Sequence, residues 1–255
     1  MKILGIDSSG LVASVAVVEN DTLLGEYSTN YKKTHSQTLL PMLDELKKMI
    51  ELDLNTVDAI AVAAGPGSFT GLRIGAATAK GLGLALGKPI VEVPTLEGLA
   101  YQLWGSSSLI CPIMDARRNQ VYTGIYEFVQ KSGSERNLNA AQSGGDPAAD
   151  ELEMQMHSVV EQSAMDIHEL LAKLGRLDRK VTFLGDGVAV YEKVIREECP
   201  VPFAFAPAHL NAQRAGSVAA LGNVYYAMGR TVSAADHQPE YLRKSQAERE
   251  REEKN

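Results

Sequence analysis

The stretch KILGIDSSGLVASVAVV (residues 2–18) contains an apolar run that ends in an aspartate, a turn of small residues and a second apolar run. Short apolar runs bounded by turn residues are typical of buried strands. Continued along the chain, the same patterns predict three strands, a helix, a strand and a helix, over residues 2–7, 12–18, 22–28, 36–51, 58–63 and 69–87. The N-terminal part is therefore expected to have the order βββαβα, an α/β arrangement.

The second half of the chain repeats this layout. LICPIMD (109–115) is an apolar run that ends in aspartate, and the alternating QVYTGIYEF (120–128) follows it. VTFLGDG (181–187) matches AVAAGPG (61–67) as an apolar strand followed by Gly-x-Gly and a helix. Repetition of one order of elements indicates duplication, so we predict two related lobes.

The predicted limits are residues 1–105 for the N-terminal lobe and 106–230 for the C-terminal lobe. An insertion at about 131–160 is rich in Ser, Gly, Asn and Asp, and its first part has few apolar residues, so we predict a flexible surface segment. Residues 231–255 are predicted to be a C-terminal tail, because they end in a charge run typical of a solvated segment.

Composition excludes several classes of protein. The 255 residues carry a net charge of -7, and such an acidic chain is a poor nucleic-acid binder by itself. No stretch is long and apolar enough to span a membrane. The first residues read as a strand and have no basic segment followed by a long apolar stretch, so we expect no signal peptide. The two cysteines are far apart in sequence, so a cytoplasmic protein with reduced thiols is expected.

The segment GPGSFTGLRIG (65–75) has the appearance of a phosphate-binding loop between a strand and a helix. A P-loop requires a GK[ST] ending, which this chain lacks, and a dinucleotide loop requires a third glycine where Thr70 stands. What remains is a glycine turn at a helix N-terminus, with Ser68 as the predicted cap and weak anion binding as the alternative.

Small residues recur every four positions along the helix that follows this loop. The ridge has two interpretations, close packing inside the lobe or docking of a partner helix, since both need backbones to approach closely. The second interpretation predicts an interface together with the apolar stripe of the helix at 36–51. Its residues are Leu39, Leu40, Leu43, Leu46, Gly71, Leu72, Arg73, Gly75, Ala79 and Gly83.

Four motifs together resemble the TsaB (YeaZ) family of bacterial tRNA threonylcarbamoyladenosine biosynthesis proteins. They are LGIDSSGLVASVAV (4–17), HSQTLLPML (35–43), AAGPGSFTGLRIG (63–75) and PEYLRKSQAE (239–248), in order across the whole chain. The resemblance implies the actin-like/Hsp70-like ATPase (ASKHA) fold, with two lobes of duplicated ribonuclease-H-like topology. It also implies two partners, a catalytic paralogue of the TsaD type and a P-loop ATPase of the TsaE type.

The resemblance implies a nucleotide cleft in vestigial form, at Asp7, Ser8, Ser9, Asp115, Gly185 and Gly187. Arginines at 117 and 118 replace the glycines expected after the second aspartate, and the alternative is that these residues only cap strands and shape turns. The catalytic relative has two metal-binding histidines where this chain has Thr95 and Leu99. We expect no metal and no required cofactor, with weak or complex-dependent binding of ATP or ADP as the limit.

The leading functional hypothesis is a non-catalytic scaffold for threonylcarbamoylation of the adenosine beside the tRNA anticodon. On this hypothesis tRNA is contacted only through the complex, and the chain forms a homodimer when its partner is absent. An ATP-dependent phosphotransferase or ATPase that uses Asp7 and Asp115 is the alternative. A peptidase is the weakest alternative, because Ser68 lacks a GxSxG context and no metal pair is present.

Overall fold

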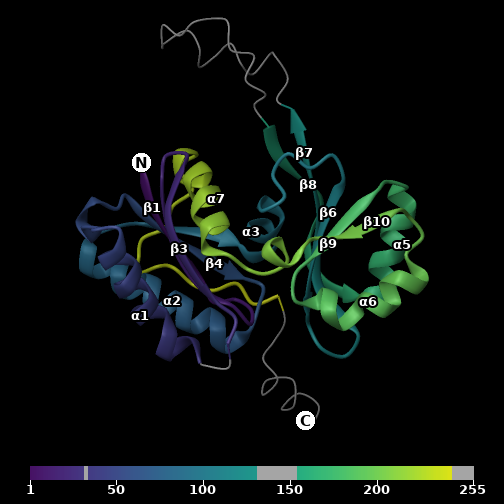
Figure 1. Cartoon of the computed structure of the whole chain (residues 1–255), viewed down its shortest axis with the longest axis horizontal. Coiled ribbons are helices and arrows are strands. Elements are labelled where there is room, and N and C mark those ends of the chain that lie inside the picture. The colour runs from purple at the N-terminus through teal and green to yellow at the C-terminus, as the bar shows by residue number, and fades with distance from the viewer. Residues whose placement is uncertain (32–33, 131–153, 243–255) are drawn as a thin grey trace, which may run out of the picture.

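The computed structural model describes residues 1–31, 34–130 and 154–242. Within these ranges the chain forms two lobes that lie side by side, each built around one sheet of five strands (Figure 1). None of the helices in the described ranges is long and apolar enough to cross a lipid bilayer.

The first sheet has the order β3-β2-β1-β4-β5. Its strands are β1 (Lys2–Asp7), β2 (Ala13–Glu19), β3 (Thr22–Thr29), β4 (Ala59–Gly65) and β5 (Ile90–Pro94). Strand β1 pairs antiparallel with β2 and parallel with β4. The central strands are almost entirely buried, which explains their continuous apolar sequences.

The second sheet repeats this topology, with the order β10-β9-β6-β7-β8. Its strands are β6 (Leu109–Asp115), β7 (Gln120–Gln130), β8 (Met154–Asp166), β9 (Val181–Leu184) and β10 (Phe203–Phe205). Strand β6 pairs antiparallel with β7 and parallel with β9, as β1 does with its neighbours. The predicted duplication of a ribonuclease-H-like unit, and with it the actin-like fold, is confirmed.

Helices cover both faces of the first sheet. α1 (His35–Met49) and α2 (Phe69–Leu86) share an apolar core with one face, and α7 (Ala215–Ala227) shares a core with the other. In the second lobe, α5 (Ile167–Leu177) and α6 (Gly187–Glu198) pack on one face of the sheet. α3 (Thr95–Tyr101) lies between the lobes and packs on β6 and β7. Two short 3-10 helices, Leu54–Thr56 and Ala208–Leu210, complete the described elements.

The position of α7 differs from the predicted limits of the lobes. Residues 215–227 belong to the predicted C-terminal lobe at 106–230, yet α7 contacts β1, β2 and β4 of the first sheet. Glycines make this contact close, because a side chain at Gly5 would overlap the carbonyl oxygen of Ala215. The chain therefore returns to its first lobe, which no local pattern in the sequence indicates.

The start of the predicted C-terminal tail is an ordered part of the fold, which corrects the prediction for residues 231–242. This segment, called here the C-terminal strap, pairs with β5 through the Ile90–Val232 bridge. Lys80 Nζ donates to the carbonyl oxygens of Ala235 (2.9 Å) and His237 (3.0 Å) in the strap. The charge run at 243–255 lies outside the described residues.

The predicted flexible insertion is partly wrong. Residues 131–153 lie outside the described ranges, but 154–160 form the first half of β8, which pairs with β7 from Gln130↔Met154 onward. The alternation of polar and apolar residues in MQMHSVV is the signal of this strand. It was hidden by the low-complexity sequence before it.

Candidate functional site

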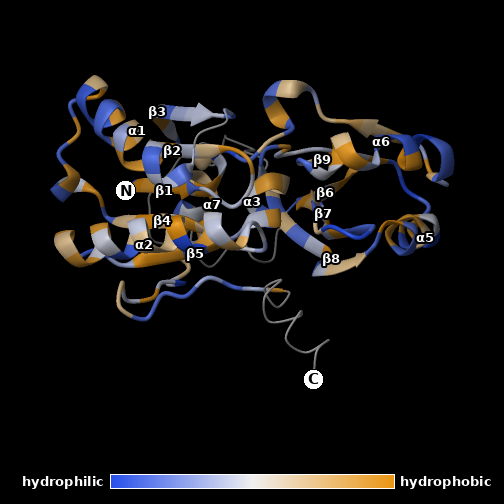
Figure 2. Ribbon diagram, turned by 90° about the horizontal axis from the view of Figure 1, so that it is seen from below, coloured by the Kyte–Doolittle hydropathy of each residue, from blue (hydrophilic) through white to orange (hydrophobic). Residues whose placement is uncertain are grey.

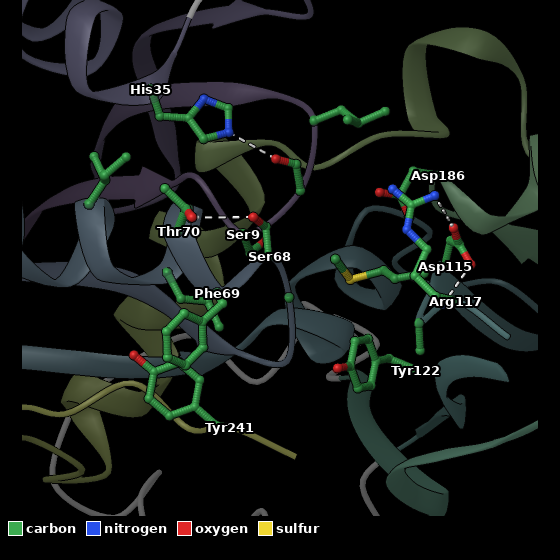
Figure 3. A pocket seen from close by; sticks show the side chains of 18 of the residues that line it. Ser9, His35, Ser68, Phe69, Thr70, Asp115, Arg117, Tyr122, Asp186 and Tyr241 are labelled. Carbon is green, nitrogen blue, oxygen red and sulfur yellow. Dashed lines mark hydrogen bonds and ion pairs between the residues drawn. The ribbon is translucent and has the colours of Figure 1, made fainter. Parts of the chain in front are cut away.

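A cleft of about 820 Å³ lies between the two lobes, which form one wall each (Figure 3). The first lobe contributes the turn after β1, the start of α1 and the loop before α2. The second lobe contributes the end of β6, Tyr122 of β7 and the turn after β9. Glu240 and Tyr241 from the C-terminal strap complete the lining, so four distant parts of the sequence meet here.

The predicted residues of the first loop lie at the floor of the cleft. Asp7 is buried at the end of β1 and accepts hydrogen bonds from the Ser9 amide (2.9 Å) and the Ser9 hydroxyl (2.6 Å). Ser8 turns away and donates its hydroxyl to the carbonyl oxygen of Gly71 (2.9 Å). Of Asp7, Ser8 and Ser9, only Ser9 lines the cleft. Asp7 contributes indirectly, because its hydrogen bonds hold Ser9 in place.

The second predicted loop forms the opposite wall. Asp115 accepts a hydrogen bond from the Arg117 amide (2.9 Å), and the Arg117 guanidinium lies 3.2 Å from its carboxylate. Arg117, Arg118 and Asn119 all have left-handed backbone, with φ of 65°, 56° and 58°. Side chains in this conformation are uncommon and cost energy, and such positions cluster at functional sites. The arginines thus occupy the left-handed turn that glycine would otherwise provide.

The glycines predicted at 185 and 187 serve packing, and the aspartate between them faces the cleft. A side chain at Gly185 would overlap the carbonyl oxygen of Ile113 in β6. Asp186 lines the cleft beside Asp115, and its Oδ1 has no hydrogen-bond partner among the described residues. Burial raises the pKa of Asp186 to about 6, and the neighbouring Asp115 charge adds to this. The Gly-Asp-Gly turn after a strand was the sequence signal for this part of the cleft, and Asp186, not the two glycines, is the residue that lines it.

Two further features of the cleft were not predicted. His35 donates its Nε2–H to the carbonyl oxygen of Gly10 (2.9 Å), which links the start of α1 to the turn after β1. Phe69 packs against Tyr241 with ring centroids 4.7 Å apart (Figure 3). The Arg73 guanidinium lies 4.0 Å from the Phe69 centroid. The described start of the motif PEYLRKSQAE, at residues 239–242, therefore supplies part of the cleft wall.

The glycines of the segment GPGSFTG pack closely against backbone atoms of the same protein. Side chains at Gly65, Gly67 and Gly71 would overlap the carbonyl oxygens of Glu240, Ser9 and Ser8, respectively. Ser68 caps the helix as predicted, since its hydroxyl accepts from the Gly71 amide (3.3 Å). These glycines therefore allow the loop to pack closely against the turn after β1 and the C-terminal strap, while Gly67 and Gly71 also line the cleft.

The predicted interface needs correction. Leu39, Leu43, Leu46, Leu72 and Ala79 are buried in the core of the first lobe, and the ridge of Gly71, Gly75 and Gly83 faces inward. Gly75 accommodates the Ser8 side chain, and Gly83 accommodates Ala234 of the strap. Close packing inside the lobe is thus the reason for the four-residue spacing. Only Leu40 and Arg73 of the predicted set are exposed.

The positions that match metal-binding histidines in the catalytic relative are part of the buried interior. Thr95 and Leu99 are almost fully buried at α3, and Leu99 belongs to the core between the lobes. Glu97 on the same helix accepts a hydrogen bond from the Tyr225 hydroxyl. Within the described ranges, no group of three His, Cys, Asp or Glu side chains has the geometry of a metal site.

Burial of Asp7 leads to a prediction about stability and pH. Burial raises the pKa of Asp7 from 3.8 to about 6, although its hydrogen bonds with Ser9 oppose the change. Because the pKa is higher in the folded state, the protonated carboxyl favours folding. This contribution to the free energy of unfolding is fully present below pH 3.8. The stabilisation is lost as pH rises through about 6, by roughly 3 kcal/mol in total.

Asp7→Asn removes this ionisation and keeps an acceptor for Ser9. We expect the variant to gain stability over the wild type as pH rises from 5 to 8, by roughly 1.5 kcal/mol over that range. Urea denaturation at each pH measures the difference. A difference that stays constant with pH would show that Asp7 is not buried as described.

Comparison with known proteins places this architecture in a family. A family model described as TsaD, tRNA N6-adenosine threonylcarbamoyltransferase, matches residues 22–251. The tRNA threonylcarbamoyladenosine biosynthesis protein TsaB of Bacillus subtilis is 33% identical over 251 residues, 97% of this chain and 96% of that protein. TsaB of Escherichia coli is 33% identical over 129 residues, 50% of this chain and 55% of that protein.

Solved structures agree with the sequence comparison. YeaZ from Pseudomonas aeruginosa superposes with a TM-score of 0.72 and 25% identity, over 94% of this chain and 99% of that chain. The fold of this chain is therefore also that of this solved structure. Since the family model covers most of the chain and the B. subtilis relative covers nearly all of it, this protein belongs to the TsaB (YeaZ) family.

Proposed function

We propose that this protein is a non-catalytic subunit for biosynthesis of N6-threonylcarbamoyladenosine at the adenosine beside the tRNA anticodon. Membership of the TsaB family supports the pathway, because the relatives from B. subtilis and E. coli are named for it. On this proposal the chain docks a catalytic paralogue of the TsaD type and holds it in its active arrangement.

One glycine supports the docking part of the proposal. Gly81 lies on the exposed side of α2, and a side chain added there would meet nothing within 4 Å. Glycine inside a helix costs about 1 kcal/mol relative to alanine. Among the residues that the structure describes, none packs against Gly81 closely enough to offset this cost. Close approach of a helix from another chain supplies the missing reason.

Residues around Gly81 form a surface that suits a helix. Arg73, Ala77, Gly81 and Leu84 are exposed at spacings of three and four along α2, so they lie on one face. α1 lies beside α2 and adds Leu40, which is 54% exposed (Figure 1). We call these five residues the docking face. The same face would pair with a second copy when the paralogue is absent, which gives a two-fold homodimer.

The proposal includes tRNA and a second protein partner, neither of which needs a site for direct chemistry on this chain. A net charge of -7 disfavours direct contact with tRNA, so the complex would supply the basic surface. A P-loop ATPase of the TsaE type would supply nucleotide chemistry, and this chain would need no cofactor of its own. We propose weak or complex-dependent ATP or ADP binding as the most that the cleft supports, and the cytoplasm as the place of action.

An ATPase is the second candidate, because Asp115 and Asp186 line the cleft and Asp7 binds Ser9, which also lines it. The residues present do not fit a triphosphate well. Arg117, Arg118 and Asn119 occupy the left-handed turn after Asp115, where glycines would let backbone amides approach a phosphate closely. A peptidase has less support, since the Ser68 hydroxyl serves as a helix cap and His35 bonds a backbone carbonyl.

Calorimetry and ATP turnover distinguish the scaffold from the ATPase. For the isolated chain titrated with Mg-ATP, we expect no saturable heat at ligand concentrations up to about 1 mM. The binding free energy would then be weaker than about −4 kcal/mol. We also expect no turnover above a buffer control. Turnover that disappears in the correctly folded Asp7→Asn variant would instead establish the ATPase.

A further inference from the structure

Arg73, at the end of the docking face nearest the cleft, is held in place by two aromatic side chains. Its guanidinium carbon lies 4.0 Å from the centroid of the Phe69 ring, and its Nε donates a hydrogen bond to the Tyr241 hydroxyl (3.4 Å). The two rings pack against each other in Figure 3. Arginine has many rotamers when it is exposed, so these contacts order a side chain that would otherwise be free to move.

Tyr241 reaches Arg73 because the C-terminal strap runs beside α2. In Figure 2 the ribbon that leads to the C-terminus passes along this helix. Lys80 of α2 donates hydrogen bonds to two carbonyl oxygens of the strap. Next to Tyr241, the Glu240 amide donates to the carbonyl oxygen of Ala64 in β4 (2.7 Å). The backbone that carries the Tyr241 ring is therefore fixed to the first lobe.

The two terminal nitrogens of Arg73 have no hydrogen-bond or ion-pair partner among the described residues. The carboxylate of Glu240, which precedes Tyr241 in the strap, accepts a hydrogen bond from Gln162 of the second lobe instead (2.9 Å). A guanidinium presents its N–H groups in a fixed fork whose geometry matches a carboxylate. Arg73 is therefore an ordered donor that the described part of the chain leaves available.

Helix α2 is positively charged although the chain as a whole is acidic. Its charged residues are Arg73 and Lys80, and it contains no aspartate or glutamate, whereas the chain has a net charge of -7. Since Lys80 is bound to the strap, Arg73 is the charge that the docking face presents. The other residues of the docking face are small or apolar. A charge buried among such residues needs an opposite charge from the partner, because an unpaired buried charge is costly.

We propose that Arg73 determines partner specificity by pairing with an aspartate or glutamate on the partner helix. This inference rests on the proposed docking of a TsaD-like paralogue. The carboxylate accepts hydrogen bonds from the terminal nitrogens of Arg73, while Phe69 and Tyr241 keep the guanidinium in position. Because the side chain is already ordered, less conformational entropy is lost on binding. A second copy of this chain presents an α2 without carboxylates, so pairing of α2 with α2 does not supply this contact.

Isothermal titration of the full chain with the purified TsaD-like subunit tests this ion pair. Arg73→Glu is expected to weaken binding about 100-fold, because it replaces attraction with repulsion between two carboxylates. Arg176→Glu is the matched control, since Arg176 is exposed on α5 of the second lobe and the net charge changes equally. This control should bind like the wild type. Both residues are exposed, so both variants should fold, which circular dichroism checks.

The salt dependence of binding separates an ion pair from a merely structural role of Arg73. Wild-type affinity should fall as the NaCl concentration rises from about 0.05 M to about 0.5 M, because salt screens the pair. Arg73→Gln should bind more weakly and lose most of this dependence. Tyr241→Ala should weaken binding roughly fivefold and keep the dependence, because the pair still forms but the arginine is no longer ordered beforehand.

Wild-type affinity in Arg73→Glu, equal weakening by Arg176→Glu, or an unchanged salt dependence in Arg73→Gln would each overturn the proposed pairing. Gly81→Arg in the same titration distinguishes this failure from failure of the docking proposal. If Gly81→Arg abolishes binding while Arg73→Glu binds like the wild type, the docking face is correct and Arg73 does not select the partner. If neither substitution weakens binding, the docking face is wrong and the role of Arg73 fails with it.

Discussion

Alanine at Gly71 is expected to lower the free energy of unfolding by about 2–3 kcal/mol, whereas alanine at Gly81 raises it by about 1 kcal/mol. Both glycines lie in α2 and both changes add one methyl group. At Gly71 the methyl overlaps the carbonyl oxygen of Ser8, a backbone atom that cannot turn aside. At Gly81 it enters open space, and only the gain in helix propensity remains.

Urea denaturation of the two single variants beside the wild type measures this contrast. Coincident circular dichroism and fluorescence transitions would show that each variant unfolds in one step. Opposite signs at the two positions are the expected result. If both variants lose or both gain stability by similar amounts, α2 does not present these faces, and the docking face would lose its basis.

Much of the fold was predictable because local sequence patterns indicate its strands and helices. Strands such as Lys2–Asp7 and Leu109–Asp115 are short apolar runs that end in aspartate, and their recurrence revealed the duplication. The return of α7 to the first sheet was not predictable. Its apolar residues are spread almost evenly around the helix, so they do not indicate which sheet the helix packs against. The C-terminal strap was predicted to be part of a solvated tail because a charge run follows it directly in the sequence.

The cleft was predictable in outline and not in detail. Asp7 and Asp115 were identified because each ends an apolar strand, as the resemblance to the actin-like ATPases implies for the residues of a nucleotide cleft. Tyr241 reaches the cleft because the C-terminal strap returns to the first lobe, a contact between distant segments that a single sequence does not encode locally. The glycine spacing in α2 was recognised correctly, but spacing alone cannot tell which neighbour approaches. The structure assigns that neighbour to the same chain.

Gly81→Arg is expected to abolish docking while leaving the subunit folded. The arginine side chain has room in the isolated chain, and it improves helix propensity. In a complex with the TsaD-like paralogue it would stand where the partner helix approaches, and we expect affinity to fall by roughly 100-fold or more. Isothermal titration of the two purified subunits measures this loss.

A matched control separates position from charge. Ala172 is exposed on α5 of the second lobe, away from the docking face, so Ala172→Arg adds the same side chain elsewhere. This variant should bind the paralogue as the wild type does. Equal weakening by both arginines would indicate long-range repulsion, and no weakening by Gly81→Arg would place the docking surface elsewhere.

Reconstituted tRNA threonylcarbamoylation tests the scaffold claim most directly. The assay contains the TsaD-like subunit, the TsaE-like ATPase and tRNA, with this chain either absent, wild type, Asp7→Asn or Gly81→Arg. We predict modification with the wild type and with Asp7→Asn, and none without the chain or with Gly81→Arg. Modification that proceeds without the chain, or that a folded and docked Asp7→Asn subunit fails to support, would contradict the account.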